Sequence, residues 1–242
     1  MLEVAELEAG YGDLRILRGV SLAVGRGERV LVFGPNGSGK STLLKAISGI
    51  LRPSAGSVRL AGSDVAGRPA HRIVRSGLSY VPQTGNIFPD LTVEENLEVG
   101  AATARRGYRE RRDAAMDLFP TLAERRRQVA GTLSGGERQL VALGRALMLD
   151  PGVLLLDEPA AALSAAMAEQ VFDHVLTVNR ERGVAILLVE QNVLKALEIV
   201  QRGYLLETGT VRLAGPVGEL RASEAVRGAY LGSSPDGPPT TP

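Results

Sequence analysis

Apolar positions follow two kinds of pattern along this chain. Short, mostly apolar runs at 28–33, 153–156 and 184–189 are typical of strands buried on both faces of a parallel sheet. After Ser41 and after Glu137, apolar residues instead recur every three or four positions, which is helical spacing. These residues are Leu43, Leu44, Ala46, Ile47 and Ile50 in the first segment, and Leu140, Val141, Leu143, Gly144, Leu147 and Met148 in the second. The alternation predicts an α/β fold.

The pattern also divides the chain. Residues 1–84 indicate strands and turns that lead into a core, about 85–149 lose strand character and indicate helices, and 150–220 return to the core pattern. The end, S-S-P-D-G-P-P-T-T-P at 233–242, has a composition typical of disorder. We therefore expect one domain over 1–232 followed by a disordered tail.

The first strand and the first helix are joined by G-P-N-G-S-G-K-S, which fits the phosphate-binding pattern G-x-x-x-x-G-K-[ST]. Its glycines allow backbone N–H groups to converge on phosphates, and the helix adds its positive N-terminal end. We expect Lys40 to reach the β- and γ-phosphates of ATP, and Ser41 to ligate Mg²⁺. The predicted nucleotide site comprises Gly34, Pro35, Asn36, Gly37, Ser38, Gly39, Lys40, Ser41 and Thr42. A glycine-rich turn without chemistry is the alternative, but strand, loop and helix agree on the phosphate-binding reading.

Two acids end the apolar run at 153–156. The carboxyl ends of strands in open α/β sheets are where ligands bind. Asp157 is therefore a candidate Mg²⁺ ligand, and Glu158 a candidate general base for the water that attacks the terminal phosphate. The alternative is that the acids only end a strand.

The sequence L-S-G-G-E at Leu133–Glu137 precedes the second helical pattern. Ser134 is a favourable N-cap, and Glu137 completes a capping box. Gly135 and Gly136 occupy the first turn, although each destabilises a helix by about 1 kcal/mol relative to a good helix former. A capped helix is the simplest interpretation, but glycines here also allow the phosphate of another molecule to approach the free N–H groups.

Together these motifs resemble the ATP-binding-cassette (ABC) ATPase family over roughly residues 2–220. The motifs that carry the resemblance are GPNGSGKST at 34–42, Gln83 in Y-V-P-Q, LSGGE at 133–137 and LLLDE at 154–158. The resemblance implies a P-loop NTPase (RecA-like) core with a mixed sheet, an inserted helical subdomain at about 85–149 and an N-terminal antiparallel β region.

The resemblance also implies a head-to-tail dimer. In it, ATP lies between the P-loop of one subunit and the LSGGE helix of the other, so Ser134, Gly135, Gly136 and Glu137 serve the partner's nucleotide. By the same match, Tyr11 in A-G-Y-G stacks on adenine, and Gln83 joins the shell of Mg²⁺ and water. The second ATPase subunit is the same chain or a different one.

Within the family the chain is most similar to ATPases of branched-chain amino acid importers. This likeness rests on residues 135–148, on L-L-V-E-Q-N at 187–192 and on R-G-Y-L-L-E-T-G at 202–209. Gln191 stands where most members have histidine, and this implies a role for Gln191 at the γ-phosphate. Because glutamine does not titrate, we expect no histidine-like step in turnover between roughly pH 6 and 7.5. Ser164 stands where the wider family has aspartate, which puts communication between the two ATP sites in doubt.

The resemblance implies permease subunits as direct partners, a substrate-binding protein as an indirect one, and a cytoplasmic location on the inner face of the cell membrane. Three alternatives stay open: an importer of urea or short-chain amides, a soluble ABC ATPase that acts on nucleic acid or ribosomes, and a degenerate cassette that binds nucleotide and only signals or scaffolds. The intact Lys40, Asp157 and Glu158 disfavour the degenerate cassette.

Composition adds few constraints. The formal net charge is +1, from 28 basic and 27 acidic residues, which gives no case for a polyanionic partner. Arginine clusters at 105–112 and 125–127 are interleaved with or flanked by acids and lack an aromatic platform, so we expect a solvated face and no nucleic-acid partner. Cysteine is absent, and no apolar run approaches the ~20 residues that span a bilayer.

Overall fold

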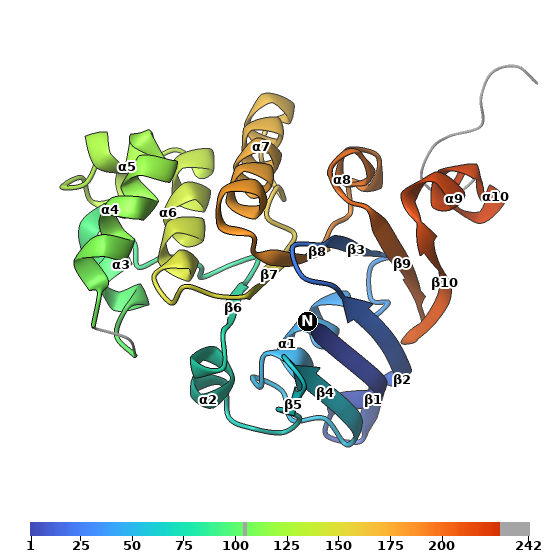
Figure 1. The fold of residues 1–242 in the computed structure, drawn as a ribbon. Helices are drawn as coiled ribbons and strands as arrows, with labels where there is room; N and C mark the ends of the chain where they lie inside the picture. Colours follow the sequence, from blue (N-terminus) through green and yellow to red (C-terminus); the bar gives the residue numbers. More distant parts are fainter. Residues whose placement is uncertain (104–105, 228–242) are drawn as a thin grey trace, which may run out of the picture.

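A computed structural model describes residues 1–103 and 106–227 of the chain, so the predicted tail at 233–242 and Arg105 lie outside the described residues. The described chain forms two sheets and a group of helices (Figure 1). The central sheet has the order β10-β9-β3-β8-β7-β6, with β10 antiparallel to an otherwise parallel set. Its strands are β3 (Arg29–Phe33), β6 (Leu78–Val81), β7 (Val153–Asp157), β8 (Ala185–Val189), β9 (Arg202–Glu207) and β10 (Thr210–Pro216).

The second sheet is antiparallel, with the order β2-β1-β4-β5. Its strands are β1 (Leu2–Tyr11), β2 (Leu14–Val24), β4 (Ala55–Leu60) and β5 (Ser63–Asp64). Together, the two sheets and the group of helices confirm the predicted α/β fold with a mixed sheet, an N-terminal antiparallel region and an inserted helical region.

The strands of the central sheet are apolar at successive positions because both faces of this sheet are buried. In β3, Leu31 and Phe33 belong to one hydrophobic core, and Val30 and Val32 to a second one on the opposite face. The first core continues into helices of the 93–147 segment, and the second into the antiparallel sheet and α1. One strand therefore holds two packed layers together just before the P-loop.

The segment between the two halves of the core is helical, in the green and yellow part of Figure 1. It contains α3 (Val93–Gly100), α4 (Tyr108–Leu118), α5 (Pro120–Glu124), the 3₁₀ turn η1 (Ala130–Thr132) and α6 (Gly135–Leu147). The other helices are α1 (Lys40–Ile47), α2 (Ala70–Arg75), α7 (Ala165–Arg182), α8 (Val193–Ile199), α9 (Val217–Ala222) and α10 (Glu224–Val226). No described helix is long and apolar enough to cross a membrane.

Two local expectations were wrong. The spacing of apolar residues predicts a helix that reaches Ile50, but α1 ends at Ile47 and Ile50 is exposed. Gly49 ends the helix with φ of 75°, in the region that favours glycine, and a Cβ there would lie 2.4 Å from the carbonyl oxygen of Arg68. The segment before residue 84 also contains α2, which buries only Ile73 and so left no periodic signal.

Candidate functional site

The P-loop between β3 and α1 has a backbone that requires glycine. Gly39 has φ of 106°, and a Cβ there would lie 2.9 Å from Cδ2 of Leu17. A Cβ on Gly34 would lie 2.0 Å from the carbonyl oxygen of Leu206. Among the described residues, the N–H groups of Asn36 and Gly37 have no acceptor within the protein. The loop is thus built as a cradle of unpaired donors.

Lys40 occupies the bottom of this cradle. Its side chain is only 5% exposed, and Nζ donates to the carbonyl oxygens of Gly34 and Pro35 at 3.0 Å each. Within the described residues, no carboxylate lies at ion-pair distance from it. Burial lowers the pKa of Lys40, while the charges of Glu158 and Asp157 act to raise it. A buried ammonium without a counter-ion fits the phosphates of a nucleotide.

Ser38 gives a second indication of a missing ligand. Its hydroxyl oxygen is the buried side-chain polar atom that has no hydrogen-bond partner in the described part of the chain. Buried polar groups are rarely left unsatisfied, so an unpaired hydroxyl in the P-loop is consistent with a polar ligand there.

Asp157 is positioned from two elements. Its Oδ1 accepts a hydrogen bond from Ser41 Oγ at 2.9 Å, and its Oδ2 accepts one from the hydroxyl of Tyr80 at 3.0 Å. Burial raises the pKa of Tyr80, and the carboxylate of Asp157 adds to this effect, so the phenol stays a donor. The sequence analysis missed Tyr80. The position of Tyr80 on β6, in register with Leu155 of β7, is the feature that could have indicated this contact.

Two of the three predicted metal ligands contact each other directly. Ser41 and Asp157 are in direct contact, and one hydroxyl and one carboxylate fit Mg²⁺, which takes its remaining oxygens from phosphates and water. The amide of Gln83 donates to Glu158, and the role of Gln83 in the metal shell stays a prediction. Within 1–103 and 106–227, no group of three His, Cys, Asp or Glu side chains could hold a metal by itself.

Glu158 lies directly after β7 in a left-handed backbone conformation, with φ of 47°, and is buried. Its N–H donates to the carbonyl oxygen of Val189 at 2.9 Å, which fixes it beside the end of β8. Two amides then donate to the same carboxylate oxygen, Oε2: Nε2 of Gln83 at 2.9 Å and Nε2 of Gln191 at 2.7 Å. In the described residues Oε1 has no protein donor, so it is the atom available to a water molecule.

These residues surround one cavity of about 310 Å³. It is lined by Ile16, Asn36, Gly37, Gly39, Lys40, Ser41, Thr42 and Glu158. Tyr11, predicted to stack on adenine, lies at the end of β1 with 48% of its surface exposed, and it does not line this cavity. Its stacking role stays a prediction.

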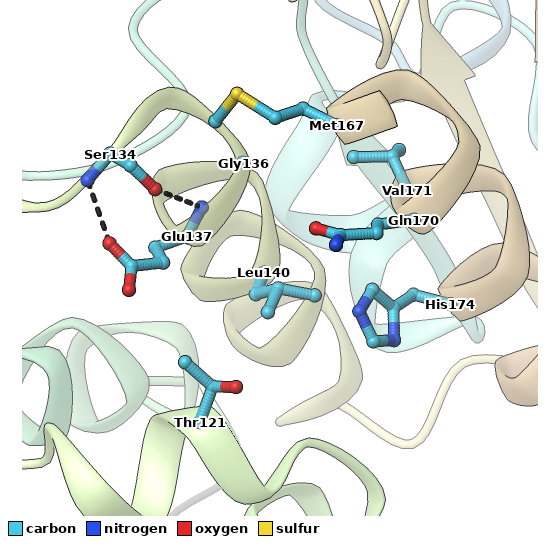
Figure 2. A pocket seen from close by; sticks show the side chains of 9 residues that line it. All are labelled: Thr121, Ser134, Gly136, Glu137, Leu140, Met167, Gln170, Val171 and His174. Atoms are coloured by element: carbon cyan, nitrogen blue, oxygen red, sulfur yellow. Dashed lines mark hydrogen bonds between the residues drawn. The ribbon is translucent and has the colours of Figure 1, made fainter. Parts of the chain in front are cut away.

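LSGGE lies elsewhere in the chain. Ser134 caps α6 in a capping box: its Oγ accepts from the N–H of Glu137 at 3.3 Å, and Glu137 Oε2 accepts from the N–H of Ser134 at 2.8 Å. This end of α6 faces a separate cavity of about 440 Å³ (Figure 2). Its lining residues are Thr121, Ser134, Gly136, Glu137, Leu140, Met167, Gln170, Val171 and His174. The two cavities share no residue, so within one chain LSGGE does not line the P-loop cavity.

Packing supplies a second reason for the two glycines of LSGGE. A Cβ on Gly135 would lie 2.8 Å from Cδ2 of Leu163, and one on Gly136 would lie 3.2 Å from Cε of Met167. The segment 158–164 and the start of α7 therefore press against the N-terminus of α6. Ser164, which replaces the family's aspartate, is the N-cap of α7.

Glu190 is a further acid that the sequence analysis did not identify. It follows β8, is 3% exposed, and accepts hydrogen bonds from the N–H groups of Ala160 and Gln191. Burial raises its pKa to about 7, and the charge of Glu158 adds to the shift, against the opposing effect of the backbone donors. A titratable group thus lies beside Gln191, and its pKa falls in the range where Gln191 by itself predicts no titration step in turnover.

Known proteins are similar to this chain over nearly its whole length. Residues 17–161 match the model of the ABC transporter family. The chain is 45% identical over 233 residues to the probable branched-chain amino acid transport ATP-binding protein LivF of Archaeoglobus fulgidus, covering 96% of this chain and 99% of that protein. It is 42% identical to the high-affinity branched-chain amino acid transport ATP-binding protein BraG of Pseudomonas aeruginosa, covering 96% and 100%. The ADP conformation of MJ1267, an ATP-binding cassette of an ABC transporter, is similar with a TM-score of 0.86 at 27% identity, covering 96% and 98%.

Proposed function

This chain belongs to the ABC transporter family and is an ATPase of that family, and from this premise we propose that it powers a membrane importer of branched-chain or other amino acids. The names of the two relatives support this class of substrate. The observation that carries the catalytic part of the proposal is the arrangement at Glu158, whose Oε2 is held by two amides while Oε1 is left for water.

The residues of the P-loop divide the work of binding. Lys40 and the unpaired N–H groups hold the phosphates. The negative charge of the phosphates provides the counter-ion that the buried ammonium group lacks within the chain. Ser41 and Asp157 would hold Mg²⁺, which would supply positive charge to offset that of the phosphates. Tyr80 keeps the carboxylate of Asp157 oriented toward Ser41.

Glu158 then acts on the attacking water. Oε1 accepts a proton as the water oxygen bonds to the terminal phosphorus and the bond to the bridging oxygen breaks, which gives ADP and phosphate. Gln83 and Gln191 orient the carboxylate through Oε2. Most of the acceleration comes from positioning and charge neutralisation, as is general for phosphoryl transfer.

The complete site requires two cassettes. We infer a head-to-tail dimer because LSGGE presents a capped helix end with two glycines at a cavity separate from the P-loop cavity. Closure of the dimer would move the helical segment and the residues after Gln83 against permease subunits at the inner face of the membrane. A substrate-binding protein would deliver the amino acid to those subunits.

The test is Glu158→Gln, which keeps the shape of the side chain and removes the base. We expect hydrolysis to fall by about 10²–10⁴-fold, while Mg-ATP binds and holds the dimer closed, visible by size-exclusion chromatography. Glu169→Gln, which changes an exposed acid on α7, is the matched control. Hydrolysis at the normal rate by Glu158→Gln would remove this residue from the mechanism.

The substrate is tested separately, in vesicles that contain this chain together with candidate permease subunits. ATP-dependent uptake of leucine, isoleucine or valine is expected. Uptake of urea or short amides instead would select the alternative importer class.

A further inference from the structure

Glu190 contacts both segments that flank the catalytic carboxylate. Its Oε1 accepts a hydrogen bond from the N–H of Ala160 at 3.1 Å, and its Oε2 accepts one from the N–H of Gln191 at 3.1 Å. Ala160 lies two residues after Glu158, on the segment 158–164 that leads to α7. Gln191 is the residue whose side chain holds Oε2 of Glu158. One buried carboxylate therefore joins the backbone on both sides of the catalytic group.

We propose that Glu190 is a positioning residue for ATP hydrolysis, whose carboxylate fixes Gln191 and the segment 158–164 relative to each other. The inference rests on the proposed function of Glu158, because Glu190 acts only through the residues that surround it.

Stability alone does not account for an acid at this place. Burying a carboxylate costs free energy that its hydrogen bonds only partly offset, and the charge of Glu158 raises the cost further. Two acceptor oxygens on one side chain are, however, what two converging N–H donors require. Glutamine offers a single oxygen, so its NH₂ group would face one of the two donors.

The segment held by Glu190 also reaches LSGGE. The N–H of Leu163 donates to the carbonyl oxygen of Ala160 at 3.3 Å, and Leu163 packs where Gly135 has no side chain. The position of Ala160 thus influences the end of α6 that serves the partner's nucleotide. This contact provides a physical link between the two sites in a chain whose segment 158–164 has Ser164 where the family has aspartate.

The experiment compares Glu190→Gln with the wild-type chain, with Glu158→Gln measured in parallel. We expect kcat of Glu190→Gln to fall about tenfold or more, the effect of losing roughly 1.4 kcal/mol of positioning. KM for ATP should change less than about twofold, because neither Lys40 nor Ser41 bonds to Glu190. Asn179→Ala is the control: Asn179 is also buried and also joins two segments, by donating to the carbonyl oxygens of Gly27 and Val184. It should lower stability and leave kcat of the folded protein unchanged.

A pH profile separates positioning from a purely structural role. Protonation turns one accepting oxygen of Glu190 into a hydroxyl, so kcat of the wild-type chain should fall as the pH is lowered through about 7, the pKa of Glu190. The charged group that acts on Glu190 is Glu158; its other neighbours, Ala160, Gln191 and Asn192, contribute neutral N–H groups. The step should be absent from Glu190→Gln.

Equal kcat and equal pH profiles for wild-type and Glu190→Gln would overturn the inference while leaving the function of Glu158 intact. Normal hydrolysis by Glu158→Gln would instead overturn the proposed function. If Glu190→Gln does not fold, amide hydrogen exchange of the wild-type chain decides. Protection of the Ala160 and Gln191 N–H groups should differ between pH 6 and pH 8 after correction for intrinsic rates and for the change in global stability, because protonation alters the oxygens that accept from them, and equal protection would contradict the inference.

Discussion

Lys40 is a buried cation whose hydrogen-bond partners, among residues 1–103 and 106–227, are two carbonyl oxygens of its own loop. Such a group is stable in the fold only because carbonyl dipoles and the nearby charges of Asp157 and Glu158 offset the loss of water. At this scale the site is a set of charged side chains that form no direct ion pair with one another, and each can be tested by removing one side chain.

Lys40→Ala should weaken ATP binding by roughly 10- to 100-fold, because it removes a charge-assisted hydrogen bond to phosphate. Lys45→Ala changes a lysine on the same helix and should bind ATP normally. The measurement is equilibrium binding of ATP to each variant. Wild-type affinity in Lys40→Ala would contradict the assignment of the P-loop.

Glu190 predicts a dependence of stability on pH. Its pKa in the folded chain is about 7, above the ordinary value of 4.5, so the folded state binds the proton more tightly than the unfolded state does. The stabilisation is complete below pH 4.5 and is lost as the pH rises through 7, a change on the order of 3 kcal/mol in the free energy of unfolding. Urea denaturation of wild-type and Glu190→Gln between pH 4.5 and 8 measures the difference. The stability of the wild-type chain relative to Glu190→Gln should fall as the pH rises, and a relative stability that rises with pH would contradict the predicted sign.

Local motifs predicted part of this site. Lys40 and Ser41 follow from one continuous stretch, and Glu158 from the end of one apolar run. Glu190 and Tyr80 act through partners 30 and 77 positions away, Ala160 and Asp157. Such contacts depend on which strands become neighbours, and periodicity within one segment carries no information about that.

Among the elements, the segment after Gln83 is held by a buried asparagine. Asn96 on α3 is fully buried; its Oδ1 accepts from the N–H of Phe88 at 2.8 Å, and its Nδ2 donates to the carbonyl oxygen of Phe88 at 2.9 Å. The loss of strand character over about 85–149 indicated helices here, but an amide facing inward has no signature in a hydrophobic pattern. The capping box of α6, in contrast, follows directly from the spacing of Ser134 and Glu137.

Asn96→Leu should lower the free energy of unfolding by about 1–3 kcal/mol, because the N–H of Phe88 would lose its acceptor inside the protein. Glu98→Gln, on the exposed side of the same helix, should leave stability within the error of the measurement. Chemical denaturation followed by circular dichroism compares the two. A neutral Asn96→Leu would mean that water replaces the lost hydrogen bonds.

For the whole molecule, the question is how two separate cavities become one site. LSGGE and the P-loop open at different places on one chain, and this separation is what a composite site between two chains requires. The sequence indicated two phosphate-binding surfaces, and the structure adds that α6 and the segment 158–164 are packed together.

Ser134→Arg should abolish turnover without weakening ATP binding to the isolated chain, because in the proposed dimer the altered helix end serves the partner's nucleotide. Mixing this variant with Lys40→Ala tests the idea. In a homodimer, the mixed pair has one site with an intact P-loop facing an intact LSGGE, so some hydrolysis should return. Weakened ATP binding by the isolated Ser134→Arg chain would rule out the two-chain site.

The position of β3 in the sheet also determines when the nucleotide cradle can first exist. β3 lies between β8 and β9, and the N–H of Gly209 donates to the carbonyl oxygen of Ser38 at 3.0 Å. During synthesis at ~5–20 residues per second, the P-loop leaves the ribosome on the order of ten seconds or more before these neighbours do. A nascent chain that stops before β9 thus contains every residue of the motif without the strand that flanks it, and ATP can assist folding only once nearly the whole chain has been made.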